Sequence, residues 1–268
     1  MMLASLPMYD LPELTAATAA WWRGLARAFR AEGVADAPEL LTAKPSLPEH
    51  WLRSDLLFSQ TCGYPLTHAL AGKVRLVATP CYKAPGCAGP SYCSLLIVAE
   101  DSGAAGLEDL RGARCAFNGV DSQSGYNVLR ATVARLAEAG RFFGAAIATG
   151  SHRASIAAVQ SGKADICAVD CVTHALLQRH APAALAGTRV LCESPSAPSL
   201  PYVTAGMADD DLIKRLHAAL DRALADPALA AVRDDLLIAG VEVLPLEAYD
   251  VLLKMEVAAA AAGYATLA

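Results

Sequence analysis

Short apolar runs alternate along this chain with longer segments of helical periodicity. This alternation is typical of βα units, in which each strand is followed by a helix that covers the sheet. It predicts an α/β fold with mainly parallel sheets. The candidate strands are Leu3–Met8, Leu56–Ser59, Val74–Thr79, Leu95–Ala99, Arg114–Asn118, Ile166–Val169 and Arg189–Cys192.

The helical segments carry apolar residues at the spacing of one buried face. The first is expected from about Pro12 to Ala31, and its aromatic residues are interpreted as core rather than as a platform for a ligand. Three more helices are expected in the last third of the chain, where they would cover the first of the two lobes that are defined below. They are Asp209–Leu224, Pro227–Ile238 and Pro245–Ala262.

Two Pro-rich segments interrupt the pattern, Pro80–Ser91 and Glu193–Pro201. Proline lacks a backbone N–H and fixes its own φ, so neither segment is expected inside a helix or a central strand. We interpret them as two hinge crossings between lobes, and a chain of 268 residues is long enough for two modest domains. Lobe 1 would then be discontinuous, with residues 1–87 plus 191–268, and lobe 2 would comprise residues 88–190.

Charge and hydropathy exclude several classes of partner. The formal net charge is −5 and the pI is about 5.7, so no basic field is available for nucleic acid. No apolar run approaches the ~20 residues that a membrane-spanning helix needs. Because the first predicted strand begins at Leu3, no room is left for a secretory leader, which predicts a cytoplasmic protein. A periplasmic location is the alternative if a leader has been removed.

The state of the cysteines bears on the location, because free thiols are typical of a reducing compartment and disulfides of exported proteins. The chain has eight of them, scattered through the predicted strands, as expected of buried thiols in a reducing compartment. Cys81, Cys87 and Cys93 are evenly spaced, but zinc ligands usually lie closer together in sequence. A disulfide within this segment is the rival interpretation, and it would indicate export. We expect no metal and no cofactor.

Polar turns follow several of the predicted strands. In the segment Arg114–Arg130, Ser122, Gln123 and Ser124 lie between the end of a strand and the start of a helix. The unpaired N–H groups and the dipole at a helix N-terminus favour a bound anion, and the serine hydroxyls add further donors. The alternative is that Ser122 or Ser124 is merely an N-cap.

Three further turns repeat this geometry. His152 is expected in the first turn of a helix, and Asp170 stands where a strand gives way to a helix, with helix capping as its alternative role. In lobe 1, Gln60, Thr61 and Tyr64 occupy a similar strand-to-helix turn. Together these turns favour a small anionic ligand.

An enzyme is the competing interpretation. Cys62 would be the nucleophile and His152 its base. No third motif that could orient the histidine accompanies them, so we expect a protein that binds its ligand without chemistry.

In order and spacing, these segments resemble the phosphate/phosphite/phosphonate-type substrate-binding proteins of ABC transporters. The resemblance runs from about residue 50 to 205, and the opening Ala4–Tyr9 is similar to the family's first strand. It rests on Leu56–Ser59, Ser91–Val98, Leu107–Gly112, Ala116–Asn118, Asp121–Tyr126, Gly150–His152 and Ala164–Asp170.

The resemblance implies a type II periplasmic-binding-protein fold, with two α/β lobes, two hinge strands and the ligand in the cleft. It implies that Ser122, Gln123 and Ser124 hold the anion, although Gln123 replaces the family's central threonine. His152 matches the family's histidine and Tyr92 the aromatic residue before the hinge strand. Asp170, Gln60, Thr61 and Tyr64 fall on its remaining ligand loops.

The implied ligand is a phosphate- or phosphonate-like anion, and the implied partner is an ABC-transporter permease. Such a protein is expected to be a monomer or a weak dimer. A cytoplasmic ligand sensor or scavenger that uses the same cleft is the alternative function.

Overall fold

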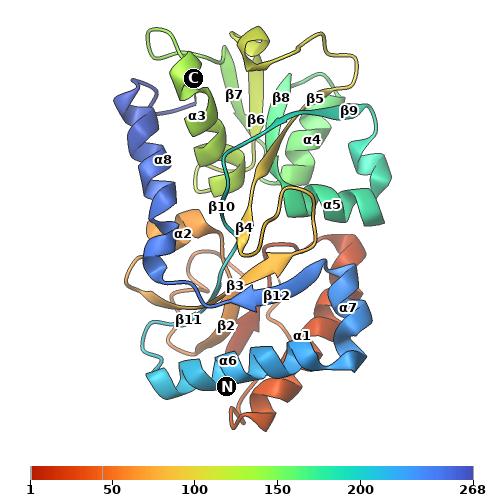
Figure 1. Cartoon of the computed structure of the whole chain (residues 1–268), viewed down its shortest axis with the longest axis vertical. Helices are drawn as coiled ribbons and strands as arrows, with labels where there is room; N and C mark the ends of the chain where they lie inside the picture. Colours follow the sequence, from red (N-terminus) through yellow and green to blue (C-terminus); the bar gives the residue numbers. More distant parts are fainter. Residues whose placement is uncertain (1, 44, 268) are drawn as a thin grey trace. The chain divides into compact units, whose positions relative to one another are not determined.

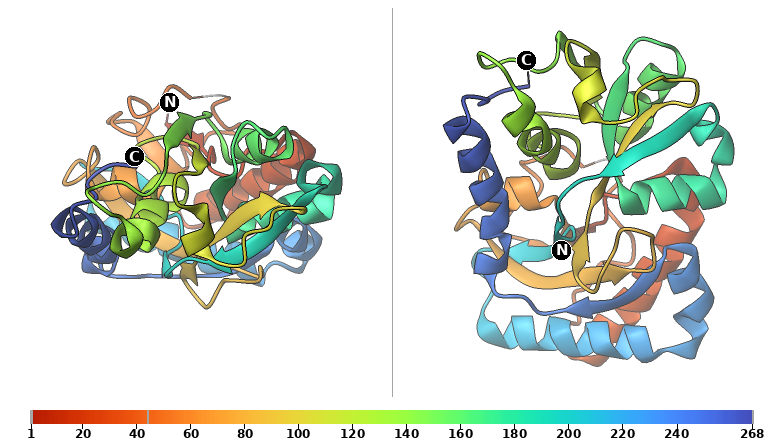
Figure 2. Two further views of the ribbon diagram at one scale, coloured as in Figure 1. Left: turned by 90° about the horizontal axis from the view of Figure 1, so that it is seen from above. Right: turned by 45° about the horizontal axis from the view of Figure 1, so that its top comes forward.

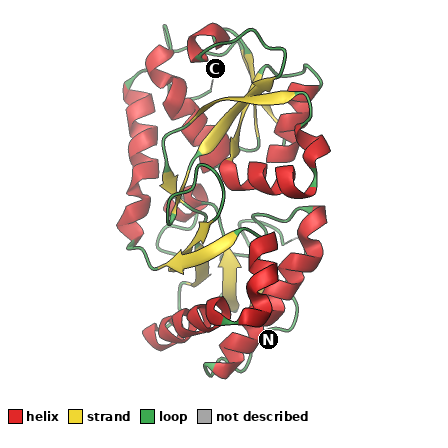
Figure 3. Cartoon of the chain, turned by 45° about the vertical axis from the view of Figure 1, so that its right-hand side comes forward, coloured by secondary structure: helices red, strands yellow, loops and turns green. Residues whose placement is uncertain are grey.

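The computed structural model describes residues 2–43 and 45–267, and their contacts divide the chain into two units (Figure 1). Unit 1 contains the chain up to residue 83, residues 88–90 and residues 198–246. Unit 2 contains residues 84–87, residues 91–197 and the chain from residue 247. Each unit has a sheet with helices, as the secondary-structure colours of Figure 3 make clear.

Unit 1 is built on a five-stranded sheet with the order β1-β2-β11-β3-β12. Its strands are β1 (Leu3–Ser5), β2 (Leu56–Gln60), β3 (Val74–Tyr82), β11 (Tyr202–Ala205) and β12 (Ile238–Glu242). Its helices are α1 (Thr15–Ala31), α2 (Gly63–Thr67), α6 (Asp210–Ala225) and α7 (Ala230–Asp235). A short 3₁₀ turn over Pro12–Leu14 leads into α1.

Aromatic residues of α1 form the core of unit 1. Trp22 and Phe29 are buried, and their rings are 5.9 Å apart. Phe29 lies 5.2 Å from Phe58 of β2, which in turn lies 4.7 Å from Tyr202 of β11. Burial of such rings removes large apolar areas from water. The interpretation of the α1 aromatic residues as core is confirmed.

Unit 2 is built on a second five-stranded sheet, with the order β7-β6-β8-β5-β9. Its strands are β5 (Ser94–Ala99), β6 (Arg114–Phe117), β7 (Ala145–Ala148), β8 (Ile166–Asp170) and β9 (Thr188–Glu193). Its helices are α3 (Val128–Val133), α4 (His152–Gln160), α5 (Cys171–His180) and α8 (Asp250–Ala261). Two short strands, β4 (Ser91–Tyr92) and β10 (Ala197–Pro198), form a separate two-stranded sheet.

The α/β class is confirmed, but the strand pairing is mixed rather than mainly parallel. Strands β6, β7 and β8 pair in parallel, whereas β5 runs antiparallel to both of its neighbours. In unit 1, β11 lies antiparallel between β2 and β3. Strand β11 follows the point where the chain returns to unit 1 and lies between two strands that precede it in sequence, whereas β8 and β9, the neighbours of β5, both come later than β5.

The last helix also differs from the prediction. We expected Pro245–Ala262 to cover lobe 1, yet the chain from residue 247 belongs to unit 2. Helix α8 packs on α3 (Figures 1 and 2), and Ala259, Tyr264 and Leu267 join the apolar core of that unit. Amphipathic periodicity shows that a helix has a buried face but not which sheet or helix covers it.

Pro80 lies inside β3, where proline was not expected. It faces Val241 of β12 on one side, while the pairing of β3 with β11 ends at Ala78. A strand position that is paired on one side only tolerates the missing N–H. None of the helices described has the length and hydropathy required to span a membrane.

Candidate functional site

A turn of π-helix follows β6 in unit 2. It covers Gln123–Asn127 and continues into α3, so that helical backbone extends from Gln123 to Val133. Ser122 is its N-cap, because its Oγ accepts a hydrogen bond from the Gly125 N–H at 3.0 Å. Ser122 thus makes the capping bond of the alternative interpretation, and its contact with a ligand stays a prediction. Single π turns are rare in proteins, and those that occur often lie at functional sites.

Three of the predicted site residues meet beside this turn. The Ser124 Oγ lies 2.8 Å from His152 Nε2, and the same nitrogen lies 3.4 Å from Asp170 Oδ2. Ser124 follows β6, His152 begins α4 after β7, and Asp170 ends β8. Because these three strands are parallel, their carboxyl ends share one edge of the sheet, where open α/β sheets bind ligands.

Asp170 also caps α5. Its Oδ1 accepts a hydrogen bond from the Thr173 N–H at 2.8 Å, and its Oδ2 accepts one from the Thr173 hydroxyl at 2.5 Å. The side chain is only 3% exposed. A carboxylate has about four acceptor positions, so these bonds leave capacity for a further donor.

His152 is held mainly in its neutral form. Burial lowers the pKa of its imidazole below the usual 6.5, while the Asp170 carboxylate and the Ala168 carbonyl oppose this shift. Its side chain is 12% exposed. A neutral imidazole has one N–H donor and one acceptor nitrogen, so it can either donate to an anionic ligand or accept from the Ser124 hydroxyl.

The geometry does not form a catalytic triad, although a serine, a histidine and an aspartate are present. In a triad, the serine and the carboxylate face opposite ring nitrogens, so that the carboxylate orients the base. Here Ser124 and Asp170 both face Nε2. The arrangement favours binding of a ligand over activation of a nucleophile.

Gly125 brings a further polar residue against the turn. A Cβ atom at this position would collide with Asn118 Oδ1, so only glycine allows the close approach. This oxygen is buried without a hydrogen-bond partner among the described residues. The sequence did not single out Asn118 as a site residue, although its position directly after β6 was a usable signal.

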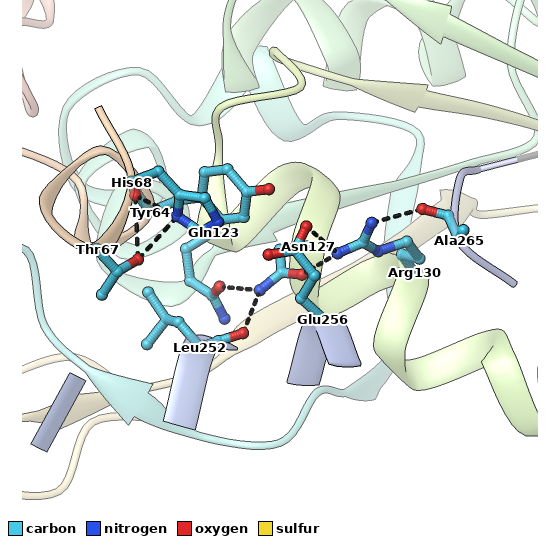
Figure 4. Close-up of polar contacts among 9 residues, drawn as sticks. All are labelled: Tyr64, Thr67, His68, Gln123, Asn127, Arg130, Leu252, Glu256 and Ala265. Carbon is cyan, nitrogen blue, oxygen red and sulfur yellow. Dashed lines mark hydrogen bonds and ion pairs between the residues drawn. The ribbon is translucent and has the colours of Figure 1, made fainter. Parts of the chain in front are cut away.

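Gln123 lies in a hydrogen-bond network inside unit 2 (Figure 4). Its Oε1 accepts from Asn127 Nδ2 at 2.7 Å, and its Nε2 lies 3.3 Å from the Met255 sulfur of α8. Asn127 Nδ2 also donates to the Leu252 carbonyl of α8 at 3.1 Å. The Gln123 side chain thus joins the π turn to α8, and its expected contact with the ligand stays a prediction.

Arg130 extends this network to the end of the chain (Figure 4). It donates to Asn127 Oδ1 and to the Ala265 carbonyl, both at 2.6 Å, and pairs with Glu256 at 3.3 Å. Its guanidinium also lies over the ring of Tyr126. Arg130 therefore joins the π turn to Ala265 and Glu256 of the same unit, although its buried Nε has no hydrogen-bond partner among the described residues.

In unit 1, Gln60 and Thr61 are also buried. Gln60 Nε2 donates to the Tyr82 hydroxyl at 2.9 Å and to the Leu200 carbonyl at 3.0 Å. The Thr61 N–H donates to the Pro201 carbonyl at 3.0 Å. These bonds join β2 to the segment that precedes β11.

Two aromatic site candidates occupy different units. Tyr64 of α2, in unit 1, stacks on His68 at 3.8 Å between ring centroids, and the His68 Nδ1 is 2.9 Å from the Tyr64 carbonyl (Figure 4). Tyr92 of β4, in unit 2, is 2% exposed.

The two residues of the alternative Cys/His site belong to different units. Cys62 belongs to unit 1 and His152 to unit 2, where Ser124 and Asp170 contact the histidine. Among residues 2–43 and 45–267, no group of three or more His, Cys, Asp or Glu side chains is arranged to hold a metal ion.

Comparison with known proteins identifies the family. The family model described as "ABC transporter, phosphonate, periplasmic substrate-binding protein" matches residues 53–249. No curated protein sequence matches the chain.

Solved structures share the fold at low sequence identity. A binding protein component of an ABC phosphonate transporter from Pseudomonas aeruginosa has a TM-score of 0.78 and 17% identity, over 97% of this chain and 87% of that chain. PhnD1 from Prochlorococcus marinus in complex with methylphosphonate has a TM-score of 0.74 and 15% identity, over 95% and 96%. A Xanthomonas citri protein bound to ATP has a TM-score of 0.71 and 17% identity, over 97% and 98%.

These matches confirm the type II periplasmic-binding-protein fold and the predicted transport role. Proteins of this family bind solutes for transport and are not enzymes. The family match covers most of the chain and includes every strand described above except β1. The chain belongs to the family of periplasmic substrate-binding proteins of phosphonate ABC transporters.

Proposed function

We propose that this protein binds a small phosphonate- or phosphate-like anion on the turn Ser122–Ser124 and delivers it to an ABC-transporter permease. The observation that carries this proposal is the hydrogen-bonding distance between Ser124 and His152 at the start of the Gln123–Val133 helical segment. Hydroxyl, imidazole and helix N–H groups are the donors that a tetrahedral oxyanion accepts.

The strength of this interaction comes from burial. Ser122 and Ser124 are each 5% exposed, so a ligand that reaches them gives up its hydration. Hydrogen bonds to a charged acceptor contribute about 1.5–3 kcal/mol each. These values are already net of the hydrogen bonds that the anion gives up in water, so each additional donor strengthens binding.

Asp170 limits which anion can bind. An ionised carboxylate repels a second anion strongly where water is scarce. The ligand should therefore present a donor to Asp170, either a protonated oxygen on its head group or an ammonium or hydroxyl group elsewhere. A phosphonate or phosphate monoanion carries such an O–H, whereas sulfate at neutral pH does not.

Calorimetry with the purified full-length protein tests the proposal. We expect methylphosphonate or inorganic phosphate to bind and sulfate of the same concentration to fail. ATP is included because a protein of the same fold was bound to it. Failure of every phosphorus oxyanion, or equal binding of sulfate, would contradict the proposed ligand class.

The permease partner and a periplasmic location are also part of the proposal, and both rest on the family match. The alternative is a sensor or scavenger with the same ligand. Ligand-dependent stimulation of ATP hydrolysis by the reconstituted transporter from the same organism would support transport. Its absence with ligand-loaded protein would favour the alternative.

A further inference from the structure

Three thiols gather at the start of α5 in unit 2. Cys87 Sγ lies 3.4 Å from Cys171 Sγ, although 84 positions separate the two residues in sequence. Cys93 belongs to the same group, because its backbone carbonyl accepts the Cys171 N–H at 3.0 Å. All three belong to the residues of unit 2, and the structure contains them as free thiols.

The backbone holds this arrangement in place. The Cys93 N–H donates to the Gly86 carbonyl at 3.1 Å, which folds the loop over the start of α5. Gly86 has a φ of +89°, and a Cβ there would lie 2.6 Å from Cys93 Sγ and 3.1 Å from Cys171 Cβ. A side chain at this position is therefore excluded twice, by conformation and by space.

The thiols differ in reactivity. Cys87 is partly exposed, and the hydrogen bond from the Cys171 thiol lowers the pKa of Cys87. Cys171 is 1% exposed, and the same hydrogen bond together with burial raises its pKa. Burial raises the pKa of Cys93 to about 12. Cys87 is thus the thiol that an oxidant meets first as a thiolate, with Cys171 as its neighbour.

We propose that Cys87 and Cys171 are a reversible oxidation site, at which a peroxide links them in a disulfide. The Cys87 thiolate attacks one peroxide oxygen and forms a sulfenic acid, while the O–O bond breaks. The other oxygen leaves as hydroxide, which takes up the proton that Cys87 released and becomes water. The Cys171 sulfur then attacks the sulfenic sulfur and displaces its hydroxide. That hydroxide takes the Cys171 proton and leaves as water, so two thiols and one peroxide give one disulfide and two waters.

The bond requires only a small movement. The two sulfurs must approach from 3.4 Å to the disulfide bond length of about 2.05 Å, which rotation about the side-chain bonds can supply. The link would join residues 84 positions apart and would fix the Gly86 loop to the residue that follows Asp170. Closing so long a loop restricts the unfolded chain, so the oxidised protein should be more stable.

Peptide mapping tests this directly. The reduced full-length protein is treated with hydrogen peroxide in its folded state, its remaining thiols are blocked, and it is digested without reduction. We expect a peptide pair linked through Cys87 and Cys171 that dithiothreitol separates. A rise of several degrees in the melting temperature should accompany the bond and disappear after reduction.

Serine variants assign the partners. Cys87→Ser and Cys171→Ser should lose the linked pair and the rise in melting temperature, whereas Cys93→Ser should keep both. Cys115→Ser is a control that should also keep the linked pair and the rise in melting temperature, because Cys115 is fully buried and burial raises its pKa to about 12. A wild-type map without the Cys87–Cys171 pair, including one in which Cys93 takes the place of Cys87, would overturn the assignment without depending on how any variant folds.

Discussion

The hydroxyl of Ser124 lies 2.8 Å from Nε2 of His152, which joins the π turn after β6 to the first residue of α4. The two residues are 28 positions apart, and each follows a strand of the same sheet. A hydroxyl held in this way loses little rotational freedom when a ligand arrives. We therefore expect this pair to contribute more to binding than a free surface serine would.

Replacement of Ser124 by alanine should weaken binding of methylphosphonate by about tenfold to a hundredfold. The reason is the loss of one hydrogen bond to a charged acceptor, which contributes about 1.5–3 kcal/mol. Titration calorimetry at fixed pH and ionic strength measures the change.

Ser161→Ala is the matched control for Ser124→Ala. The Ser161 hydroxyl donates to the Ala157 carbonyl at 2.8 Å at the end of α4, in the same unit but outside the candidate site. The affinity of Ser161→Ala for methylphosphonate should equal that of the wild type. If Ser124→Ala also retains wild-type affinity, the serine turn is not where the anion binds.

Asp170→Asn should change which ligands bind while preserving the fold. Asparagine can still accept from the Thr173 N–H, so most of the cap on α5 remains. Loss of the negative charge removes the repulsion of a dianion, so sulfate should now bind and the dependence of affinity on pH should weaken. Calorimetry with sulfate and methylphosphonate between pH 6 and 8 gives both results.

Asp209→Asn is the control for the capping role. Asp209 caps α6 of unit 1 by accepting from the Leu212 N–H at 2.8 Å, which matches the contact that Asp170 makes with Thr173. The thermal stability of Asp209→Asn should change by the same small amount as that of Asp170→Asn, and its ligand selectivity should equal that of the wild type. Identical selectivity and pH dependence in Asp170→Asn would leave Asp170 with capping alone.

Local sequence patterns predicted seven of the strands, but the candidates did not include β7, β11 and β12 of the two five-stranded sheets or the two-residue strands β4 and β10. β12 covers Ile238–Glu242, includes Gly240, and overlaps the end of a predicted helix. Its strand conformation comes from pairing with β3, a tertiary contact that outweighs its weak β propensity. β11 is a short buried strand directly after Pro201, so alternation along it could not be detected.

The positions of the candidate site residues could be predicted only in part. Ser124, His152 and Asp170 each follow an apolar strand, so their presence at one sheet edge followed from the βα pattern. The contacts of the Gln123 side chain with Asn127 and Met255 did not follow from that pattern, because a π turn adds a residue and redirects the side chains after it. Sequence periodicity contains no signal for one such turn, and only the contacts with Asn127 and Met255 reveal it.

Stability should fall as the pH is lowered below about 6.5, in part because of His152. Burial lowers its pKa in the folded protein, whereas in the unfolded chain the pKa returns to about 6.5. The unfolded state then binds more protons, so this contribution is complete above pH 6.5 and is lost as the pH falls toward the lowered folded value. Urea unfolding between pH 5 and 8 measures it.

His152→Gln separates this effect from the other histidines. Burial also lowers the pKa of His50 and of His174, but both remain in the variant. The free energy of unfolding of the wild type minus that of His152→Gln should therefore decrease toward low pH. Parallel curves for the two proteins across this range would mean that His152 does not titrate differently in the two states.

Gly125→Ala should destabilise unit 2 by about 1–3 kcal/mol, the usual cost of inserting a methyl group into a filled space. The new Cβ would collide with Asn118 Oδ1, so the turn or the Asn118 side chain would have to move, and His152 Cε1, 3.3 Å away, would have to shift slightly. Affinity for methylphosphonate should fall as well, because Ser124 is the preceding residue. In Gly103→Ala the new methyl group would have no atom within 4 Å, so the unfolding free energy should stay within about 0.5 kcal/mol of the wild type. Urea unfolding of both variants decides the matter, since equal stabilities would show that the backbone around Gly125 can open without cost.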